Sequence, residues 1–184
     1  MIDLLNTWLE RMPFINDNAY RANYHPISGN HQSPIFWNDY KYVYVNSLAE
    51  AKKNEAFFKQ IFNDDSANSG RLLSAKACRS ALFILLYRGY PMPELPFGLL
   101  GTLLEIDNQS GNWRYRHINM VQRMIGTRIG TGGSSGAGYL KAAMDKHYIF
   151  KEIAQLNSFI IDRRKLPVLP MELTMKLGYH FVQS

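Results

Sequence analysis

The chain has 184 residues, 46% of them hydrophobic, which is enough to bury one core, so a single domain is the default expectation. Its net charge is +6, but acidic residues lie among the short basic clusters and no zinc-finger or RNA-binding motif accompanies them. We therefore expect a solvated basic surface and no nucleic-acid partner. The single cysteine, Cys78, excludes a disulfide framework and a thiolate metal cluster. No apolar run reaches the roughly 18 residues that span a membrane and no signal-peptide pattern is present, so we expect no membrane partner and a cytoplasmic location.

In chain order, the first predicted element is a helix over residues 3–12, which Pro13 ends. The segment 14–46 is expected to be irregular because it is rich in Pro, Gly, Asn and Tyr. Within it, residues 40–45 have the propensity of a strand. No partner strand is obvious elsewhere in the chain, so we do not assign one there.

Two capping patterns predict the next two helices. Ser47 and Glu50 have the spacing of a capping box for a helix that runs to about residue 62. After a polar turn, Ser74 is placed to cap a helix that contains the run 81–86, which is apolar on every face and is therefore expected to be buried. Cys78 lies in this helix and is expected to be a small core residue.

The middle of the chain predicts a link and two further helices. Residues 90–94 read as a proline-containing link, and Pro96 suits the first turn of a helix that ends near residue 107. A separate helix follows from Trp113, and Gly126 is its expected C-terminal stop. The candidates for its N-cap are the polar residues just before it, Asp107, Asn108 and Ser110.

The last part of the chain predicts helix again over residues 139–161 and 172–181, with a break at 166–170. Many helices, short links and no convincing sheet together predict an all-α bundle.

The helix from Trp113 carries His117 on its apolar face. The residues that share this face by helical spacing are Trp113, His117, Met120, Val121 and Met124. A neutral imidazole in such a setting can ligate iron through one ring nitrogen and donate its other N–H to an acceptor. The alternative is a core histidine bonded to a backbone carbonyl, and the spacing alone leaves both interpretations open.

A glycine-rich loop, GTGGSSG at residues 130–136, follows this helix. Its glycines permit close approach of the backbone to a ligand, and its N–H and hydroxyl groups can bind a carboxylate or propionate. The hydroxyl of Thr131 can also accept from an ammonium group. No strand precedes the loop and no GK[ST] follows it, which excludes a P-loop and a dinucleotide fingerprint. A flexible linker is the alternative, but apolar helical segments on both sides favour a packed turn.

The stretch 113–140, with the pattern WRYRHxxMVxRMIGxxxGTGGSSGxxYL, resembles the signature of the tryptophan 2,3-dioxygenase family. The pattern is long and specific, and the resemblance extends over nearly the whole chain. It implies an all-α helical bundle enclosing a b-type haem pocket, like the indoleamine and tryptophan dioxygenases. It also implies that residues 1–184 form a single helical domain corresponding to the C-terminal half of such an enzyme.

Carried over residue by residue, the resemblance implies that His117 is the proximal, axial ligand of the haem iron and that Trp113 packs on the haem side. It implies that Thr131 contacts the ammonium group of the amino-acid substrate and that Gly132 belongs to the same substrate-binding loop. No catalytic residue is assigned in this chain.

The function implied by the resemblance is that of a haem-dependent dioxygenase, or of a fragment or subunit of one. Such an enzyme uses O2 to cleave the indole ring of L-tryptophan to N-formylkynurenine, in tryptophan catabolism by the kynurenine pathway. Family members carry a further N-terminal half with a distal histidine and an arginine that holds the substrate carboxylate, and neither is present here at a matching position. A homo-oligomer or pairing with an N-terminal half is therefore implied. The alternatives are a non-catalytic haem-binding or assembly module and a related haem enzyme acting on another indole.

Overall fold

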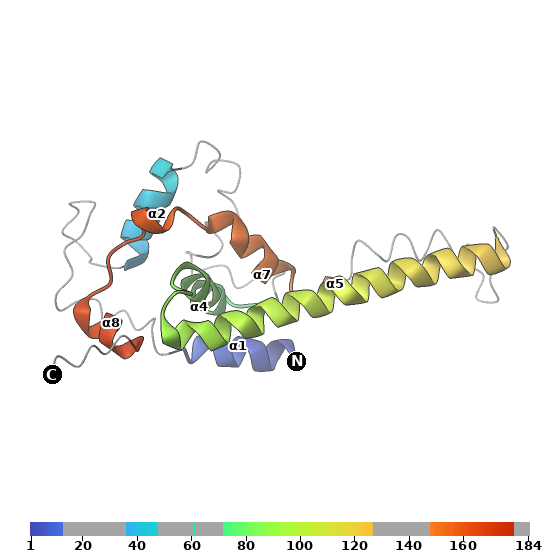
Figure 1. The fold of residues 1–184 in the computed structure, drawn as a ribbon, viewed down its shortest axis with the longest axis horizontal. Coiled ribbons are helices and arrows are strands. Elements are labelled where there is room, and N and C mark those ends of the chain that lie inside the picture. The colour runs from blue at the N-terminus through green and yellow to red at the C-terminus, as the bar shows by residue number, and fades with distance from the viewer. Residues whose placement is uncertain (13–35, 48–60, 62–71, 127–147, 179–184) are drawn as a thin grey trace. The chain divides into compact units, whose positions relative to one another are not determined.

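The computed structural model describes residues 1–12, 36–47, 61, 72–126 and 148–178, and every regular element in these ranges is a helix. The all-α prediction is therefore confirmed for the described part of the chain. No helix in these ranges is long and apolar enough to cross a membrane. The elements in chain order are α1 (Ile2–Glu10), α2 (Phe36–Ser47), α4 (Ala75–Leu86), α5 (Pro91–Ile125), α7 (Lys151–Leu156), the short 3-10 helices η4 (Asn157–Phe159) and η5 (Arg163–Lys165), and α8 (Met171–Lys176) (Figure 1).

The contacts divide the chain into two compact units. The first unit comprises Met1–Gly98 and Gln155–Ser184, and the second comprises Leu99–Ala154. The core of the first unit contains most of α4, and the second unit contains most of the long helix α5.

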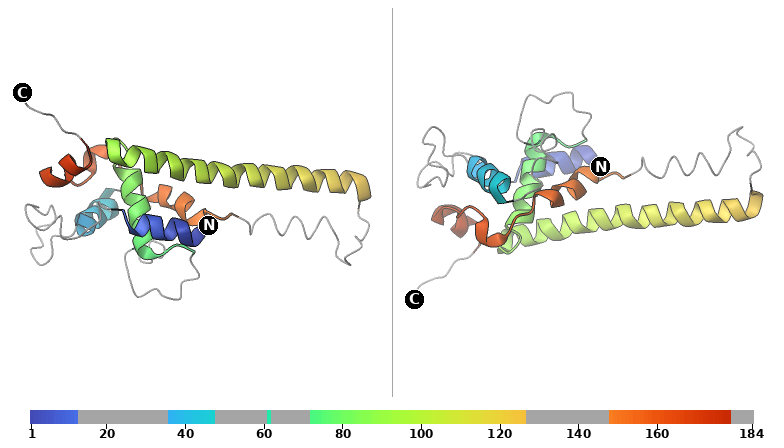
Figure 2. Two further views of the ribbon diagram at one scale, coloured as in Figure 1. Left: turned by 90° about the horizontal axis from the view of Figure 1, so that it is seen from below. Right: turned by 90° about the horizontal axis from the view of Figure 1, so that it is seen from above.

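In the first unit, α1 packs against α4 (Figures 1 and 2). Ser74 joins the two helices, because its hydroxyl accepts from the Ala77 N–H at 3.1 Å and donates to the Glu10 carboxylate of α1. The Ser74 N–H in turn donates to Asn6 Oδ1 at 2.9 Å. The predicted first helix and the predicted Ser74 cap are both confirmed. The apolar run 81–86 and Cys78 are buried, as expected.

Helix α2 corrects the prediction that the whole of segment 14–46 is irregular. Phe36, Tyr40 and Tyr44 recur at helical spacing and are all buried, and Phe36 packs edge-on against Phe83 of α4 with 5.7 Å between ring centroids. Burial of this aromatic face outweighs the strand propensity of residues 40–45. Those residues form no strand, as expected, but they are helical and not irregular.

Tyr40 couples the stability of the first unit to alkaline pH. Its hydroxyl donates to the Phe159 carbonyl, and burial, followed by the neighbouring Tyr44, raises the pKa of Tyr40 well above its ordinary value. The fold therefore favours the neutral phenol, and this stabilisation is present below the unfolded-state pKa of about 10 and is lost as the pH rises above it.

We expect the free energy of unfolding to fall as the pH rises above about 10, by up to about 1.4 kcal/mol per pH unit from this one group. At neutral pH, the free energy of unfolding of the Tyr40→Phe variant should be about 1 kcal/mol lower than that of the unmodified chain. Above about pH 10, it should fall less steeply with pH. Denaturant unfolding between pH 8 and pH 11 measures both. The control is Tyr42→Phe, because Tyr42 is exposed on the same helix. Equal alkaline slopes for Tyr40→Phe and Tyr42→Phe would rule out this role for Tyr40.

Residues 91–125 form one continuous helix, where the sequence predicted a link, a short helix and a separate helix from Trp113. Figure 2 shows α5 unbroken in both views. Pro91 opens the helix, where a missing N–H costs nothing because the first turn has no intrahelical acceptor. Pro96 lies inside α5, so one hydrogen bond of the helix ladder is absent there without ending the helix.

The N-caps predicted for the separate helix are wrong, because Asp107, Asn108 and Ser110 all lie in the interior of α5. The buried carboxylate of Asp107 instead accepts from the N–H groups of Ile149 at 3.2 Å and Phe150 at 2.7 Å. These groups directly precede α7, so Asp107 supports the start of a helix more than 40 positions later in the chain. Asp107 thus accepts backbone N–H groups as an N-cap residue does, but from a segment distant in the sequence.

The remaining predictions are confirmed in part. Gly126 follows α5 directly with φ of 61°, which confirms it as the C-terminal stop. Residues 166–170 lie outside any helix, and α8 begins one residue before the expected position. Of the predicted helix 139–161, α7 and η4 occupy 151–159, whereas 139–147 lie outside the described residues. Ser47, predicted to cap the next helix, is the last residue of α2. Pro13, Glu50 and residues 179–181 lie outside the described ranges.

Candidate functional site

His117 lies in the C-terminal half of α5, within the second unit. Its imidazole stacks on the indole ring of Trp113, one helical turn earlier, with 5.3 Å between ring centroids and 9° between ring planes. The side chain is half-buried, and no hydrogen bond to its ring nitrogens is formed within the described part of the chain. The structure therefore brings two of the predicted site residues into contact.

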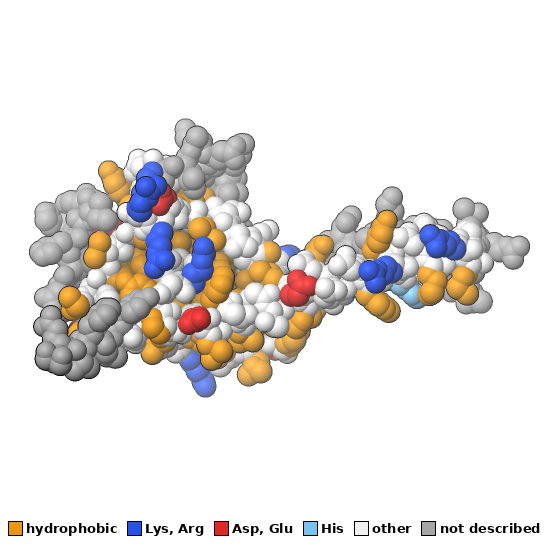
Figure 3. Space-filling model, viewed as in Figure 1, with side chains coloured by type: hydrophobic (Ala, Val, Ile, Leu, Met, Phe, Trp, Pro, Cys, Tyr) orange, Lys and Arg blue, Asp and Glu red, His pale blue; other side chains and the backbone are white. Residues whose placement is uncertain are grey.

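An apolar stripe surrounds His117 on α5, which we define as Trp113, Met120, Val121 and Met124. Trp113 is 67% exposed and Met124 76% exposed, so the described residues do not cover this stripe. Figure 3 shows a histidine side chain at the surface with hydrophobic side chains next to it. The expected apolar setting of His117 is thus present. A fully buried histidine bonded to a carbonyl, the alternative from the sequence, is not what this part of the chain contains.

The side of α5 that is buried in the second unit differs from the side that carries the apolar stripe. Leu100, Asp107 and Ile118 are the buried residues of the helix within the second unit, and their spacings of 7 and 11 place them along one line. His117 directly precedes Ile118, which corresponds to a turn of about 100° around the helix axis. Helix α5 therefore packs with one side and presents the apolar stripe on another.

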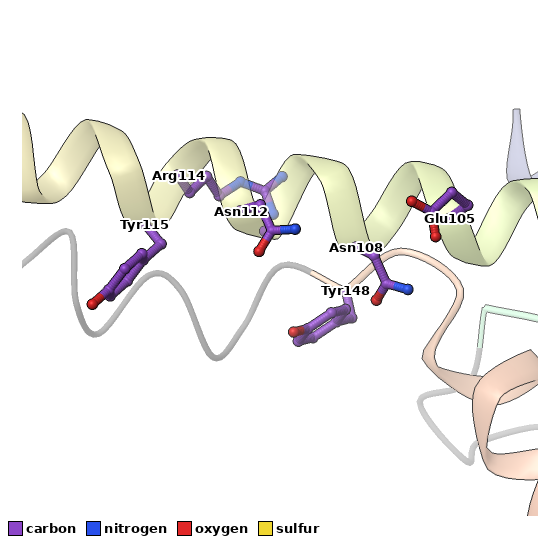
Figure 4. A pocket seen from close by; sticks show the side chains of 7 residues that line it. Glu105, Asn108, Asn112, Arg114, Tyr115 and Tyr148 are labelled. Carbon is purple, nitrogen blue, oxygen red and sulfur yellow. The ribbon is translucent and has the colours of Figure 1, made fainter.

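A cavity of about 490 Å³ lies along α5 in the second unit, and Figure 4 shows Asn108, Tyr115 and Tyr148 on one side of the helix there. Tyr115 is two residues before His117, which corresponds to about 200° around the helix axis. The cavity and the apolar stripe are therefore on different sides of α5, and no described residue that lines the cavity is a predicted site residue. Its lining residues are Glu105, Asn108, Gly111, Asn112, Arg114, Tyr115 and Tyr148.

The sequence did not point to this cavity. Its α5 residues are polar or small and recur at helical spacing, which is also typical of a solvated face. The remaining lining residue, Tyr148, comes from the segment before α7, which the Asp107 hydrogen bonds to Ile149 and Phe150 hold against α5. No local sequence signal reports such a long-range contact.

The predicted substrate-binding residues, Thr131 and Gly132, lie outside the described residues. Of the predicted site, the structure thus places His117 and Trp113.

The chemistry of the described residues fits a haem better than a metal ion held by side chains alone. No group of three or more His, Cys, Asp or Glu side chains that could hold a metal ion occurs among them. A haem iron needs only one axial ligand from the protein because the porphyrin supplies four nitrogens, and the flat macrocycle needs an apolar surface. The imidazole of His117 has the chemistry of such an axial ligand, and the apolar stripe has the chemistry of such a surface.

Comparison with known proteins gives one consistent result. The family model described as tryptophan 2,3-dioxygenase matches residues 2–160. The tryptophan 2,3-dioxygenase of Dictyostelium discoideum is 37% identical over 187 residues, which cover 92% of this chain and 46% of the relative. The enzyme of the same name from Bdellovibrio bacteriovorus is 34% identical over 206 residues, covering 97% of this chain and 54% of the relative.

A third relative, the tryptophan 2,3-dioxygenase of Alteromonas mediterranea, is 34% identical, with 98% of this chain and 53% of the relative covered. The chain thus spans about half the length of the curated relatives it matches, and the matched part is their C-terminal half. On these matches, and on the helical fold with His117 in its apolar setting, the chain belongs to the tryptophan 2,3-dioxygenase family.

Proposed function

We propose that this chain supplies the haem-binding half of a dioxygenase that cleaves the indole ring of L-tryptophan to N-formylkynurenine with O2. The family supports the reaction class. The observation that carries the proposal is the His117 imidazole, which stacks on Trp113 within an apolar stripe. Among the described residues, nothing covers this stripe and the imidazole has no hydrogen-bond partner.

In this proposal His117 is the axial ligand and Trp113 fixes the orientation of its ring. A stacked imidazole cannot rotate freely, so its lone pair keeps one direction. The ring N–H opposite the iron needs an acceptor, which strengthens the histidine as a donor to the metal. Met120 and Met124 exclude water from the porphyrin face. When bound, a ferrous haem b supplies the activation of O2 for addition to the indole double bond.

Thr131 and Gly132 are proposed to hold the amino-acid end of the substrate. A hydroxyl and backbone N–H groups in a glycine-rich loop suit charged atoms, whereas the indole ring needs an apolar wall. This division of roles predicts that substrate binding and haem binding respond to different substitutions.

The Thr131→Ala variant is expected to bind L-tryptophan more weakly by about 1–2 kcal/mol, because a hydrogen bond to a charged group is lost. Its haem content should stay close to that of the unmodified chain. Thr131→Ser is the matched control, since it keeps the hydroxyl and should retain most of the affinity. Spectral titration of the haem-loaded complex with L-tryptophan measures the effect. An unchanged affinity in Thr131→Ala would remove Thr131 from the site.

We further propose that the apolar stripe is covered in the working protein, either by a second copy of the chain or by an N-terminal half of the kind found in its relatives. Exposed apolar surface of this kind is typical of association surfaces.

The reaction itself is tested by co-expressing the chain with the N-terminal half of the Bdellovibrio bacteriovorus relative. The haem-loaded complex is supplied with L-tryptophan or with indole-3-propionate, which lacks the ammonium group. Formation of N-formylkynurenine from L-tryptophan is the expected result. Haem uptake without product from any indole would instead support the non-catalytic module, and preference for the other indole would support a related enzyme.

A further inference from the structure

A cavity of about 420 Å³ lies in the first unit, between the end of α4 and the segment that runs from η5 to α8. Its volume is in the range of sites for small organic molecules. The lining combines the aromatic rings of Tyr87 and Tyr90 with the apolar side chains of Val168 and Met171 and the guanidinium of Arg163. None of these residues belongs to the proposed haem and tryptophan site.

The wall formed by Tyr87 is held rigidly. The Tyr87 hydroxyl donates to the Pro167 carbonyl at 2.6 Å, and its ring stacks on Phe83 with 4.8 Å between centroids. Val168 and Met171 are 82% and 75% exposed, so two apolar side chains of the lining face water. A ligand with an apolar body would remove this surface from water, which is favourable.

Among the described residues of this lining, Arg163 is the one with a charged side chain. Its guanidinium lies directly against Gly89, since a Cβ atom added at Gly89 would clash with Nη2 of Arg163. Arg163 also lines a smaller adjoining cavity of about 70 Å³, next to Arg88. Figure 3 shows basic side chains set among hydrophobic ones over the first unit.

The neighbouring residues Arg88 and Arg164 each bind a partner, whereas the Arg163 guanidinium has no acceptor among the described residues. Arg164 holds the Asp162 carboxylate at 2.7 Å and lowers the pKa of that group to about 2. Arg88 donates to the Leu85 carbonyl at 3.1 Å and lies over the ring of Phe97. In the described part of the chain, no carboxylate or carbonyl accepts from the Arg163 guanidinium.

We propose that this cavity binds a small monocarboxylate with an aromatic or branched apolar body. Its carboxylate would accept from the Arg163 guanidinium, whose planar fork matches two oxygens. Its apolar body would lie against Tyr87 and Tyr90, with Val168 and Met171 closing over it. One cation among apolar and aromatic walls suits a single carboxylate better than a phosphate, which has no apolar part to bury.

The test uses 3-(4-fluorophenyl)propionate as the probe and the full 184-residue chain. Fluorine NMR is expected to show saturable broadening of the probe signal. The matching amide, which lacks the charge, should bind about tenfold or more weakly because a charge-assisted hydrogen bond is lost. Acetate and inorganic phosphate should also compete poorly, because they lack the apolar body. Equal binding of probe and amide, or equally effective competition by phosphate, would overturn the proposal.

Two substitutions localise the site. Arg163→Gln is expected to weaken probe binding about tenfold or more, whereas Arg164→Gln, the same charge change one residue later, should leave it nearly unchanged. Gly89→Ala should weaken it as well, because the new methyl group displaces the Arg163 guanidinium. Gly89 does not have a positive φ, so alanine fits its backbone, and far-UV circular dichroism should be unchanged. Unaltered binding in Arg163→Gln, or equal losses in Arg163→Gln and Arg164→Gln, would refute the assignment.

Discussion

Replacing His117 by alanine is expected to abolish the Soret band of the haem-reconstituted protein. The imidazole of His117 is half-buried within an apolar stripe, and its ring nitrogens form no hydrogen bond with another described residue, so it is the ligand that this surface can offer to iron. Alanine leaves the stripe intact but removes the nitrogen. Haem that adsorbs to the apolar surface without an axial bond from the protein is removed with the excess haem before the spectrum is taken.

The control for this variant is His147→Ala, which removes another histidine that the family pattern does not assign to haem. It is expected to retain haem like the unmodified chain. Absorbance spectra after removal of excess haem measure both variants. Equal haem retention in His117→Ala and His147→Ala would mean that the axial ligand is another residue.

Expressed by itself, the 184-residue chain is expected to turn over L-tryptophan at least about a thousandfold more slowly than when it is complemented by an N-terminal half. Productive orientation of the substrate depends on fixing its carboxylate, for which a bidentate arginine is the usual solution. The family resemblance places that arginine outside the segment that this chain matches. Loss of a charged anchor and of one wall of the pocket amounts to about 4 kcal/mol or more of transition-state stabilisation.

The same chain should also self-associate, because Trp113, Met120 and Met124 are exposed on one side of α5. The comparison is made on reduced, haem-loaded protein by following the absorbance of N-formylkynurenine, with and without the N-terminal half of a relative. Light scattering on both samples reports association. Rapid turnover by the chain alone would mean that its own residues complete the site, and the proposed division of labour between two halves would be wrong.

Much of the fold follows from helical spacing in the sequence. The Ser74 cap, the buried run 81–86 and the Gly126 stop are local patterns, and each is present in the structure. Local patterns gave wrong helix boundaries where contacts distant in the sequence determine the structure. Asp107 has the residue type of an N-cap, but it accepts from Phe150 across the second unit, so α5 runs through it without a break.

Helix α2 is the second such case. Residues 40–45 carry β-branched and aromatic side chains, and only their neighbours Phe36 and Phe159 show that the aromatics pack as one helical face. Phe159 is distant in the sequence, and Phe36 lies before residues 40–45, so neither belongs to the segment with strand propensity. Burial against them outweighs intrinsic propensity.

For the candidate site, spacing alone placed His117 and Trp113 on one face of a helix, and the structure stacks them. Spacing could not tell whether that face is buried, because an apolar stripe has the same pattern whether it meets a core, a cofactor or a partner. Trp113 and Met124 are exposed among the described residues, so the described core does not cover the stripe. This agrees with the proposal that the stripe meets a cofactor or a partner. The cavity beside Arg163 gave no sequence signal, because its walls come from segments about 75 positions apart.

The most direct test of haem ligation by His117 is rescue of the His117→Gly variant by free imidazole. Glycine opens a space at the position of the missing ring beside Trp113, and imidazole from solution can fill it and ligate the iron. Haem-loaded His117→Gly is expected to lack the histidine-ligated spectrum, and millimolar imidazole is expected to restore it, whereas the spectrum of the unmodified protein should not change. A histidine-ligated spectrum in His117→Gly without added imidazole would contradict His117 as the axial ligand and with it the proposed haem site on α5.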